Sequence, residues 1–270
     1  MNDPIVFITS MNERLFTDYG RNLLSSWIQY SSLDAVLVVC YDDDDNKYMR
    51  EFDTRNIIQM SIWSDEMRVF FDKYGQFAEA NGFKFTPNSL ENWKSASVKY
   101  DHRFDAMRFS FKSFALKKCI EAGLTTNLFA WLDADVVCHH PFSPEKLKAV
   151  FPAPDELATY LGRQSYPQPI PYTECGFVGY NGQNPATFEF LKQFESFYTE
   201  GNLFFLSEWH DCLVFDYLRG KFEEKGEKFR NLMAEKPDLE DPFMSSDLSH
   251  YFDHLKGPDR KKIGSSYTQT

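Results

Sequence analysis

The sequence has 270 residues and contains no apolar run close to the roughly 18 residues that a membrane-spanning helix needs. Its first residues, Met-Asn-Asp-Pro, lack the basic and apolar regions of a secretory signal peptide. We therefore expect a cytoplasmic protein with no integral membrane span.

Positive charge is scarce as well. The chain has 29 Lys and Arg residues against 40 Asp and Glu residues, which gives a formal net charge of -11. This acidic balance disfavours binding to nucleic acids and to anionic membrane surfaces, because both are negatively charged. A local basic cluster can still bind one phosphate-bearing ligand.

Cysteines are few, and their spacing argues against a zinc site of the usual sequence pattern and against a disulfide framework. The five cysteines are widely spaced, odd in number and without a C-x-x-C pair: Cys40, Cys119, Cys138, Cys175 and Cys212. Neither a zinc site nor a disulfide framework is expected from such spacing. We expect buried free thiols.

Two catalytic signatures are also missing, the G-x-x-x-x-G-K-[ST] phosphate loop and the H-E-x-x-H zinc motif, so P-loop and zincin chemistry are disfavoured. There is no internal repeat, low-complexity linker or break in composition. With 43% hydrophobic, 26% charged and 17% aromatic residues, the chain is typical of a soluble globular protein with a large core. We expect a single domain over residues 1–270.

Strand and helix patterns alternate along the chain. A β-branched run at 4–10, an amphipathic stretch at 15–30 and an apolar run at 35–41 predict a βαβ unit, and hence a parallel sheet. Further strands are predicted at 57–62, 157–161 and 175–181, and further helices at 63–80, 104–121, 185–199 and from Ser207. The predicted fold is α/β, with a Rossmann-type, mostly parallel central sheet and flanking helices.

Residues 129–137, Phe-Ala-Trp-Leu-Asp-Ala-Asp-Val-Val, are the most informative stretch. Asp133 and Asp135 interrupt an apolar run typical of a buried parallel strand. Residues i and i+2 of a strand point to the same side, and the carboxyl ends of strands in α/β sheets border ligand crevices. Two carboxylates there predict a site for a hard cation, with two solvated turn aspartates as the alternative.

This stretch resembles the D-x-D element of glycosyltransferases with the GT-A fold. The early βαβ order, the segment Glu174–Asn181 and the late His254-x-Lys-Gly resemble the same architecture. The Lys-Pro-Trp of one retaining family is absent, and Arg-Lys-Lys at 260–262 stands there instead. The resemblance implies a nucleotide-binding part at about 1–140 and an acceptor-binding part at about 141–270.

The resemblance also implies a metal and two substrates. Asp133, Asp135 and His254 would hold Mn²⁺ or Mg²⁺, with Asp135 as the main ligand and Asp133 nearer the ribose. The donor would be a UDP-sugar or a GDP-sugar. The acceptor would be a hydroxyl of a glycan or glycolipid, as in polysaccharide biosynthesis.

Several residues are predicted to contact the nucleotide-sugar. Arg108 and Lys112 are four residues apart on one helix face that would meet the diphosphate, although an ordinary charged surface is the alternative. The others lie at strand ends or in the late motif: Thr9, Ser10, Asp42, Asp133, Gly176 and Lys256. For Asp42, the first of four successive aspartates, a solvated turn explains the pattern equally well.

A sugar hydroxyl is a poor nucleophile near neutral pH, so an inverting transferase needs a carboxylate base. Asp211 is the first candidate, because inverting GT-A enzymes similarly place a base at the start of a helix after the Gly-containing strand. Glu208, one turn away, and Glu174 are the competitors. The alternative is that these acidic residues only complement a helix N-terminus.

Other functions remain open from the sequence. A retaining glycosyltransferase is the nearest alternative to an inverting one. A metal-dependent nucleotidyltransferase or phosphohydrolase can also use paired aspartates at a strand end. The remaining alternative is a non-catalytic binder of nucleotide-sugars.

Overall fold

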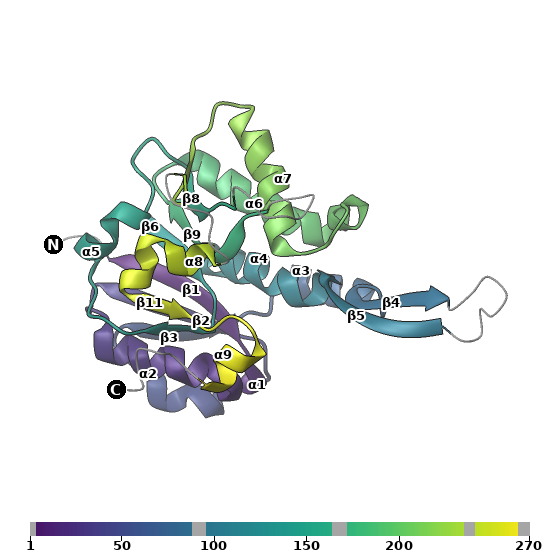
Figure 1. The fold of residues 1–270 in the computed structure, drawn as a ribbon, viewed down its shortest axis with the longest axis horizontal. Coiled ribbons are helices and arrows are strands. Elements are labelled where there is room, and N and C mark those ends of the chain that lie inside the picture. Colours follow the sequence, from purple (N-terminus) through teal and green to yellow (C-terminus); the bar gives the residue numbers. More distant parts are fainter. Residues whose placement is uncertain (1–3, 88–95, 164–171, 235–240, 264–270) are drawn as a thin grey trace.

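The computed structural model describes residues 4–87, 96–163, 172–234 and 241–263. Its centre is a seven-stranded sheet in the order β10-β8-β9-β6-β1-β2-β3 (Figure 1). The strands are β1 (Ile5–Met11), β2 (Ala35–Tyr41), β3 (Ile57–Ser61), β6 (Leu128–Leu132), β8 (Ala158–Leu161), β9 (Glu174–Asn181) and β10 (Phe229–Asn231).

The sheet is mostly parallel, as predicted. β1 runs parallel to β2 and β6, β2 to β3, and β8 to β10. Only β9 is antiparallel to its neighbours β6 and β8 in this sheet. The chain builds outward from β1 to β3 and then returns to the other side of β1 with β6, so the topological switch point lies between β1 and β6.

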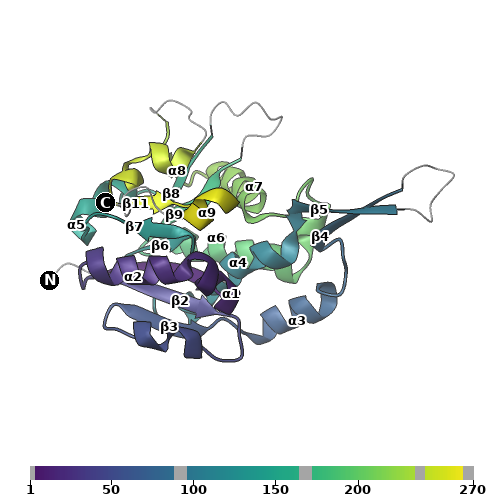
Figure 2. The ribbon, with the colours of Figure 1, turned by 60° about the horizontal axis from the view of Figure 1, so that its bottom comes forward.

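Helices cover both faces of the sheet. α2 lies on one side, and α3, α4, α6 and α7 lie on the other (Figures 1 and 2). The longer helices are α2 (Arg21–Tyr30), α3 (Asp65–Tyr74), α4 (Ala106–Glu121), α6 (Pro185–Thr199) and α7 (Asp211–Glu223). α3, α4, α6 and α7 share one core layer, and α2 contributes to the other.

Successive side chains of β1 pack alternately into the two core layers. Val6 and Ile8 belong to the layer under α4, whereas Ile5 and Phe7 belong to the layer under α2. Phe7 is fully buried and makes an edge-to-face contact with Trp27 of α2, with ring centroids 5.1 Å apart. Both faces of β1 are therefore buried, as expected of a central parallel strand.

Helix boundaries match the predictions where the capping residues are local. Asn184 accepts a hydrogen bond from the Ala186 amide and Pro185 opens α6, as predicted. The helix predicted from Ser207 instead begins at Asp211, because the His210 side chain accepts the Leu213 amide at the N-cap.

Other predicted helices were too long or too uniform. The helix predicted at 63–80 is shorter, since α3 starts after the Ser64 cap and ends at Tyr74. The stretch predicted as one helix at 15–30 consists of the end of α1 (Glu13–Leu15), a π-helical turn (Phe16–Gly20) and α2.

Two antiparallel pairs complete the fold. β4 (Asn81–Pro87) and β5 (Ala96–Asp105), which were not predicted, form a hairpin that projects from the body of the molecule (Figures 1 and 2). β7 (Val136–Cys138) pairs with β11 (Phe252–His254), which brings the late part of the chain next to the strand that follows the two aspartates.

The remaining helical segments are short. They are α5 (Pro144–Leu147), α8 (Pro242–Ser245), α9 (Pro258–Ile263) and 3-10 turns at Lys47–Phe52, Lys148–Val150, Asn202–Phe205 and Asp247–His250. Across the described residues, no helix combines the length and the apolar character needed to cross a membrane.

The substitution Phe7→Ala is expected to lower the free energy of unfolding by about 3–5 kcal/mol, because it leaves a cavity among packed aromatic rings. Urea denaturation measures this change. Phe205→Ala is the matched control, since Phe205 is 90% exposed and its loss should change the free energy by less than about 0.5 kcal/mol. Equal effects of the two substitutions would contradict the assignment of Phe7 to the core.

Candidate active site

A cleft of about 660 Å³ opens at the carboxyl ends of β1, β2 and β6. Ser10, Asp42 and Asp133 line it where these three strands end. The cleft therefore lies at the topological switch point, where open α/β sheets bind their ligands. The base of the β4–β5 hairpin and the start of α7 contribute further walls.

Asp133 and Asp135 lie in the turn that joins β6 to β7, and backbone hydrogen bonds fix that turn. The Asp133 amide donates to the Gly176 carbonyl at 2.9 Å, and the Leu255 amide donates to the Asp135 carbonyl at 2.9 Å. The Trp131 indole donates to Asp133 Oδ1 at 2.6 Å, which orients that carboxylate. β9 and the late segment thus hold the D-x-D turn from two sides.

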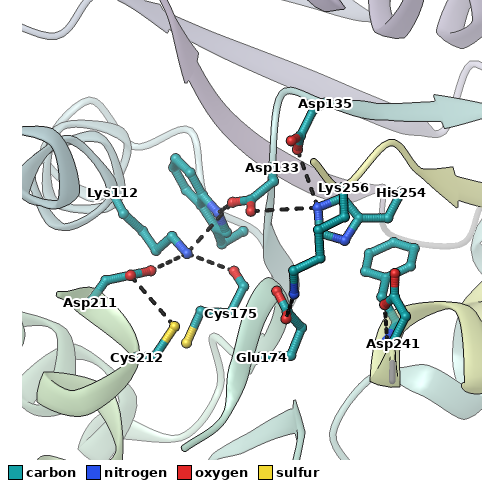
Figure 3. A network of polar contacts seen from close by, with 12 residues as sticks. Lys112, Asp133, Asp135, Glu174, Cys175, Asp211, Cys212, Asp241, His254 and Lys256 are labelled. Carbon is teal, nitrogen blue, oxygen red and sulfur yellow. Dashed lines mark hydrogen bonds and ion pairs between the residues drawn. The ribbon is translucent and has the colours of Figure 1, made fainter. Parts of the chain in front are cut away.

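His254 completes a cluster with the two aspartates. One ligand atom from each of Asp133, Asp135 and His254 lies within 4.8 Å of the others. The β7–β11 pairing places His254 opposite Val136, so His254 Nε2 lies 3.3 Å from Asp135 Oδ1 and 4.0 Å from Asp133 Oδ2 (Figure 3). The predicted metal ligands are therefore side by side.

The charges of the cluster compensate one another, with His254 buried and the two aspartates partly buried. Burial disfavours the imidazolium, but the hydrogen bond and charge of Asp135 raise the pKa of His254 to about 9. Burial also opposes the charge on Asp135, yet His254 and Lys261 hold its pKa below the usual range. For Asp133 burial prevails over Lys112, and its pKa is raised.

Lys261 provides a second cation at this cluster. Its ammonium lies 2.7 Å from Asp135 Oδ2 and 4.4 Å from the centre of the Tyr19 ring. Arg260 is directed elsewhere and forms two hydrogen bonds to the buried Asp253. The Arg-Lys-Lys segment at 260–262 stands where one retaining family has Lys-Pro-Trp. One of its residues, Lys261, contacts the D-x-D turn.

Lys112 links two acidic groups beneath the cleft. Its buried ammonium pairs with Asp211, lies 3.6 Å from Asp133 Oδ1 and donates to the Cys175 carbonyl at 2.6 Å (Figure 3). Burial favours the neutral amine, but Asp211 and Asp133 outweigh it and raise the pKa of Lys112. Arg108 and Lys112, the residues predicted to meet the diphosphate, both line the cleft, and Lys112 is buried instead of lying on a surface face.

The three predicted catalytic carboxylates differ in their surroundings. Asp211 is 2% exposed and lines the cleft at the start of α7. Glu208 is not among the lining residues and instead binds Arg103 and His210 at 3.1 and 2.9 Å. The prediction that Glu208 lies one helical turn from Asp211 on the same face was wrong, because α7 begins only at Asp211.

Glu174 lines the cleft between two cations. It forms ion pairs with Arg163 and Lys256. Burial alone would raise its pKa, but Lys256, His254 and Arg163 lower it to about 2. A general base works best with a pKa near the working pH, so this environment disfavours Glu174 as a base.

Three residues that were predicted to contact the nucleotide-sugar do not line the cleft. Thr9 is fully buried and does not line the cleft, because its neighbour Ser10 faces it and adjacent residues of a strand point to opposite sides. At Gly176 a Cβ would lie 3.0 Å from His254 Cε1, so the glycine makes room for this imidazole. Lys256 holds Glu174 and is not a lining residue.

The lining residues that sequence reasoning missed include Asn12, Cys175, Cys212 and Lys261. Asn12 carried a local signal, since it follows a predicted strand; it caps α1 by accepting the Leu15 amide. The cysteines carried none, because they come from different elements and are distant in the sequence.

The sequence was compared with family profiles and with curated proteins, and neither comparison finds a match. Among solved structures, the apo bifunctional glycosyltransferase WbbM superposes with a TM-score of 0.52 at 10% identity, over 100% of this chain and 50% of that chain. The chain has a GT-A-like glycosyltransferase fold. This GT-A-like chain spans about half the length of WbbM.

Two other solved structures are similar to the GT-A-like chain at lower scores. A glycosyltransferase involved in glycosylation of the major capsid of PBCV-1 has a TM-score of 0.49 at 13% identity, over 97% of this chain and 100% of that chain. Mouse xyloside xylosyltransferase 1 has a TM-score of 0.43 at 14% identity, over 86% of this chain and 85% of that chain.

The pKa of His254 predicts a pH-dependent stability. Because its native pKa of about 9 exceeds the ordinary 6.5, the imidazolium stabilises the fold fully below pH 6.5, and this contribution is lost as the pH rises through 9. The difference in unfolding free energy between the wild type and His254→Gln should fall over this range by a total on the order of 3 kcal/mol.

Urea denaturation at a series of pH values in a metal chelator measures this difference. His250→Gln is the matched control, since this histidine lies on a nearby turn outside the cluster. A wild-type-to-variant difference that is independent of pH would contradict the ion pairing of His254.

Proposed function

We propose that the chain is a metal-dependent glycosyltransferase that moves a sugar from a nucleoside-diphosphate donor to a hydroxyl acceptor. The single observation that carries the proposal is the cluster of Asp133, Asp135 and His254 at the edge of the cleft in a GT-A-like fold. In this proposal the nucleotide lies against residues of about 1–140, and a glycan or glycolipid acceptor approaches from about 141–270.

The donor set fits a hard or borderline divalent cation. Two carboxylate oxygens and a neutral imidazole nitrogen suit Mn²⁺, and the carboxylates alone suit Mg²⁺. His254 must give up its proton to act as a ligand, and Lys261 must leave Asp135. When bound, the ion would neutralise charge that develops on the leaving diphosphate.

The chain's own groups would orient the donor. Ser10 and Asp42 border the cleft at the ends of β1 and β2, where a nucleoside is expected. Arg108 is a lining residue on α4 and can bind phosphate oxygens, since guanidinium geometry matches them.

Asp211 is the proposed base of an inverting reaction. It is the lining carboxylate of α7, and among the described residues its cationic partner is Lys112. An acceptor hydroxyl that hydrogen-bonds to Asp211 would lose its proton to this carboxylate as the sugar is transferred. The Lys112 ammonium pairs with Asp211 and lies 3.6 Å from Asp133 Oδ1, so one cation links the proposed base to the D-x-D turn.

Asp135→Asn should reduce transfer more than a hundredfold, since loss of a partner of a metal ligand alone costs about 10–100-fold in metal affinity or activity. Calorimetry with UDP and GDP, with and without Mn²⁺, measures metal-dependent nucleotide binding, which the variant should also lose. Asp45→Asn is the matched control, because the Asp45 side chain is 44% exposed and pairs with Lys47 outside the cleft. Unchanged Mn²⁺-dependent binding in Asp135→Asn would refute the metal site.

Asp211→Asn should reduce the rate of sugar transfer by about 10²–10⁴-fold, the usual contribution of a general base, while Mn²⁺-dependent nucleotide binding persists. Product analysis of UDP- and GDP-sugar reactions measures both rate and class. Release of nucleoside diphosphate supports a transferase, whereas release of pyrophosphate would identify a nucleotidyltransferase. Glu208→Gln is the control and should keep the wild-type rate, because Glu208 does not line the cleft. An unchanged rate in Asp211→Asn would show that Asp211 is not the base.

A further inference from the structure

A second cluster of possible metal ligands lies beside the first and has different chemistry. Cys175, Asp211 and Cys212 each offer one ligand atom, and these atoms lie within 4.8 Å of one another. Figure 3 shows the two sulfur atoms side by side, with the Asp211 carboxylate next to them. The Cys212 thiol lies 3.6 Å from Asp211 Oδ1 as a hydrogen-bond donor.

The positions of the three groups are fixed by secondary structure. Cys175 is the second residue of β9, and Asp211 and Cys212 are the first two residues of α7. Cys175 and Asp211 are each 2% exposed, while Cys212 is partly exposed. All three line the cleft, so an ion in the cleft can reach them without unfolding the chain.

The spacing suits one tetrahedral ion. Zn²⁺ binds thiolate sulfur at about 2.3 Å, so two sulfurs on one ion are about 3.8 Å apart, which requires only small side-chain shifts here. Thiolates favour zinc-like ions, whereas Mn²⁺ and Mg²⁺ favour oxygen ligands. The two clusters therefore differ in the class of ion that they select.

We propose that Cys175, Asp211 and Cys212 form a second metal site for a thiophilic divalent cation of the Zn²⁺ class. The protein supplies three ligands, and the fourth position faces the cleft. On binding, the two thiols lose their protons and each sulfur, with one Asp211 oxygen, donates an electron pair to the ion. No redox step is involved.

Lys112 shows that this corner of the cleft accommodates positive charge. Its ammonium pairs with Asp211 and donates a hydrogen bond to the Cys175 carbonyl. A divalent ion would replace this ammonium at Asp211, and Lys112 would keep Asp133, 3.6 Å away, and the Cys175 carbonyl as partners. The exchange therefore leaves no buried cation without a partner.

Occupancy of this site would inhibit sugar transfer, a consequence that rests on the proposed function. Asp211 cannot accept the acceptor's proton while it ligates a metal. Mn²⁺-dependent nucleotide binding at Asp133 and Asp135 would continue. Zn²⁺ would thus inhibit turnover, whereas Mn²⁺-dependent donor binding would be weakened but not prevented.

The test is titration of the purified full chain with Co²⁺, a spectroscopic substitute for Zn²⁺, under a phosphine reductant. We expect about one equivalent of thiolate-to-Co²⁺ charge-transfer absorption with the visible bands of tetrahedral Co²⁺, both removed by Zn²⁺. Cys212→Ser should abolish the charge-transfer band or weaken Co²⁺ binding at least about tenfold. Cys175→Ser should do the same.

Two control variants separate this site from other ligands. Cys138→Ser removes a buried thiol elsewhere and should keep the band. Asp135→Asn changes the oxygen-rich cluster of Asp133, Asp135 and His254, which lies outside the proposed thiol site, and should also keep the charge-transfer band. Thermal unfolding of every variant confirms that it is folded.

Absence of charge-transfer absorption in the wild type would overturn the proposal, as would a band that survives in both folded variants, Cys175→Ser and Cys212→Ser. The titration requires no turnover, so it is independent of the transferase proposal. A Co²⁺ band in a chain that transfers no sugar would support the metal site and refute only the proposed function.

Discussion

Buried negative charge at the carboxyl edge of the sheet is the constraint on which the rest of the site depends. Asp133, Asp135, Glu174 and Asp211 converge on one cleft, and a carboxylate without a partner in such a place is strongly destabilising. Each has a cation: Lys112 serves Asp133 and Asp211, His254 and Lys261 serve Asp135, and Arg163 and Lys256 serve Glu174. α4, β11 and the residues after β11 supply four of these cations: Lys112, His254, Lys256 and Lys261.

The origin of these cations explains why the late part of the chain belongs to the site. β11 adds only three residues to a two-stranded pair, yet it brings His254 to the D-x-D turn and starts the segment that carries Lys256 and Lys261. A divalent ion at Asp133 and Asp135 would have to replace a proton on His254 and the ammonium of Lys261. The chain therefore holds Asp135 paired with two cations, His254 and Lys261, and the proposed metal ion would compete with both.

The parts predictable from the sequence are those with local causes. Strand periodicity located β1, β2 and β9, the D-x-D run marked two of the three residues of a cluster that could hold a metal ion, and Asn184 with Pro185 marked the start of α6. The failures required a partner from elsewhere in the chain. Whether Thr9 or Ser10 faces the cleft depends on the sheet's orientation, Lys112 is buried because Asp211 lies opposite it, and Cys175 meets Cys212 only when α7 packs near β9.

Lys112 lies between the two proposed cation sites and interacts with one carboxylate of each. Its ammonium lies between Asp133, a member of the oxygen-rich cluster, and Asp211, a member of the thiol-containing one. An ion at Asp133 repels the ammonium toward Asp211, and an ion at Asp211 repels it toward Asp133. Because coupling between two binding sites is reciprocal, each ion must weaken the other's binding by the same factor. One buried lysine thus makes the chemistry of the hard and soft sites interdependent, although they have no ligand in common.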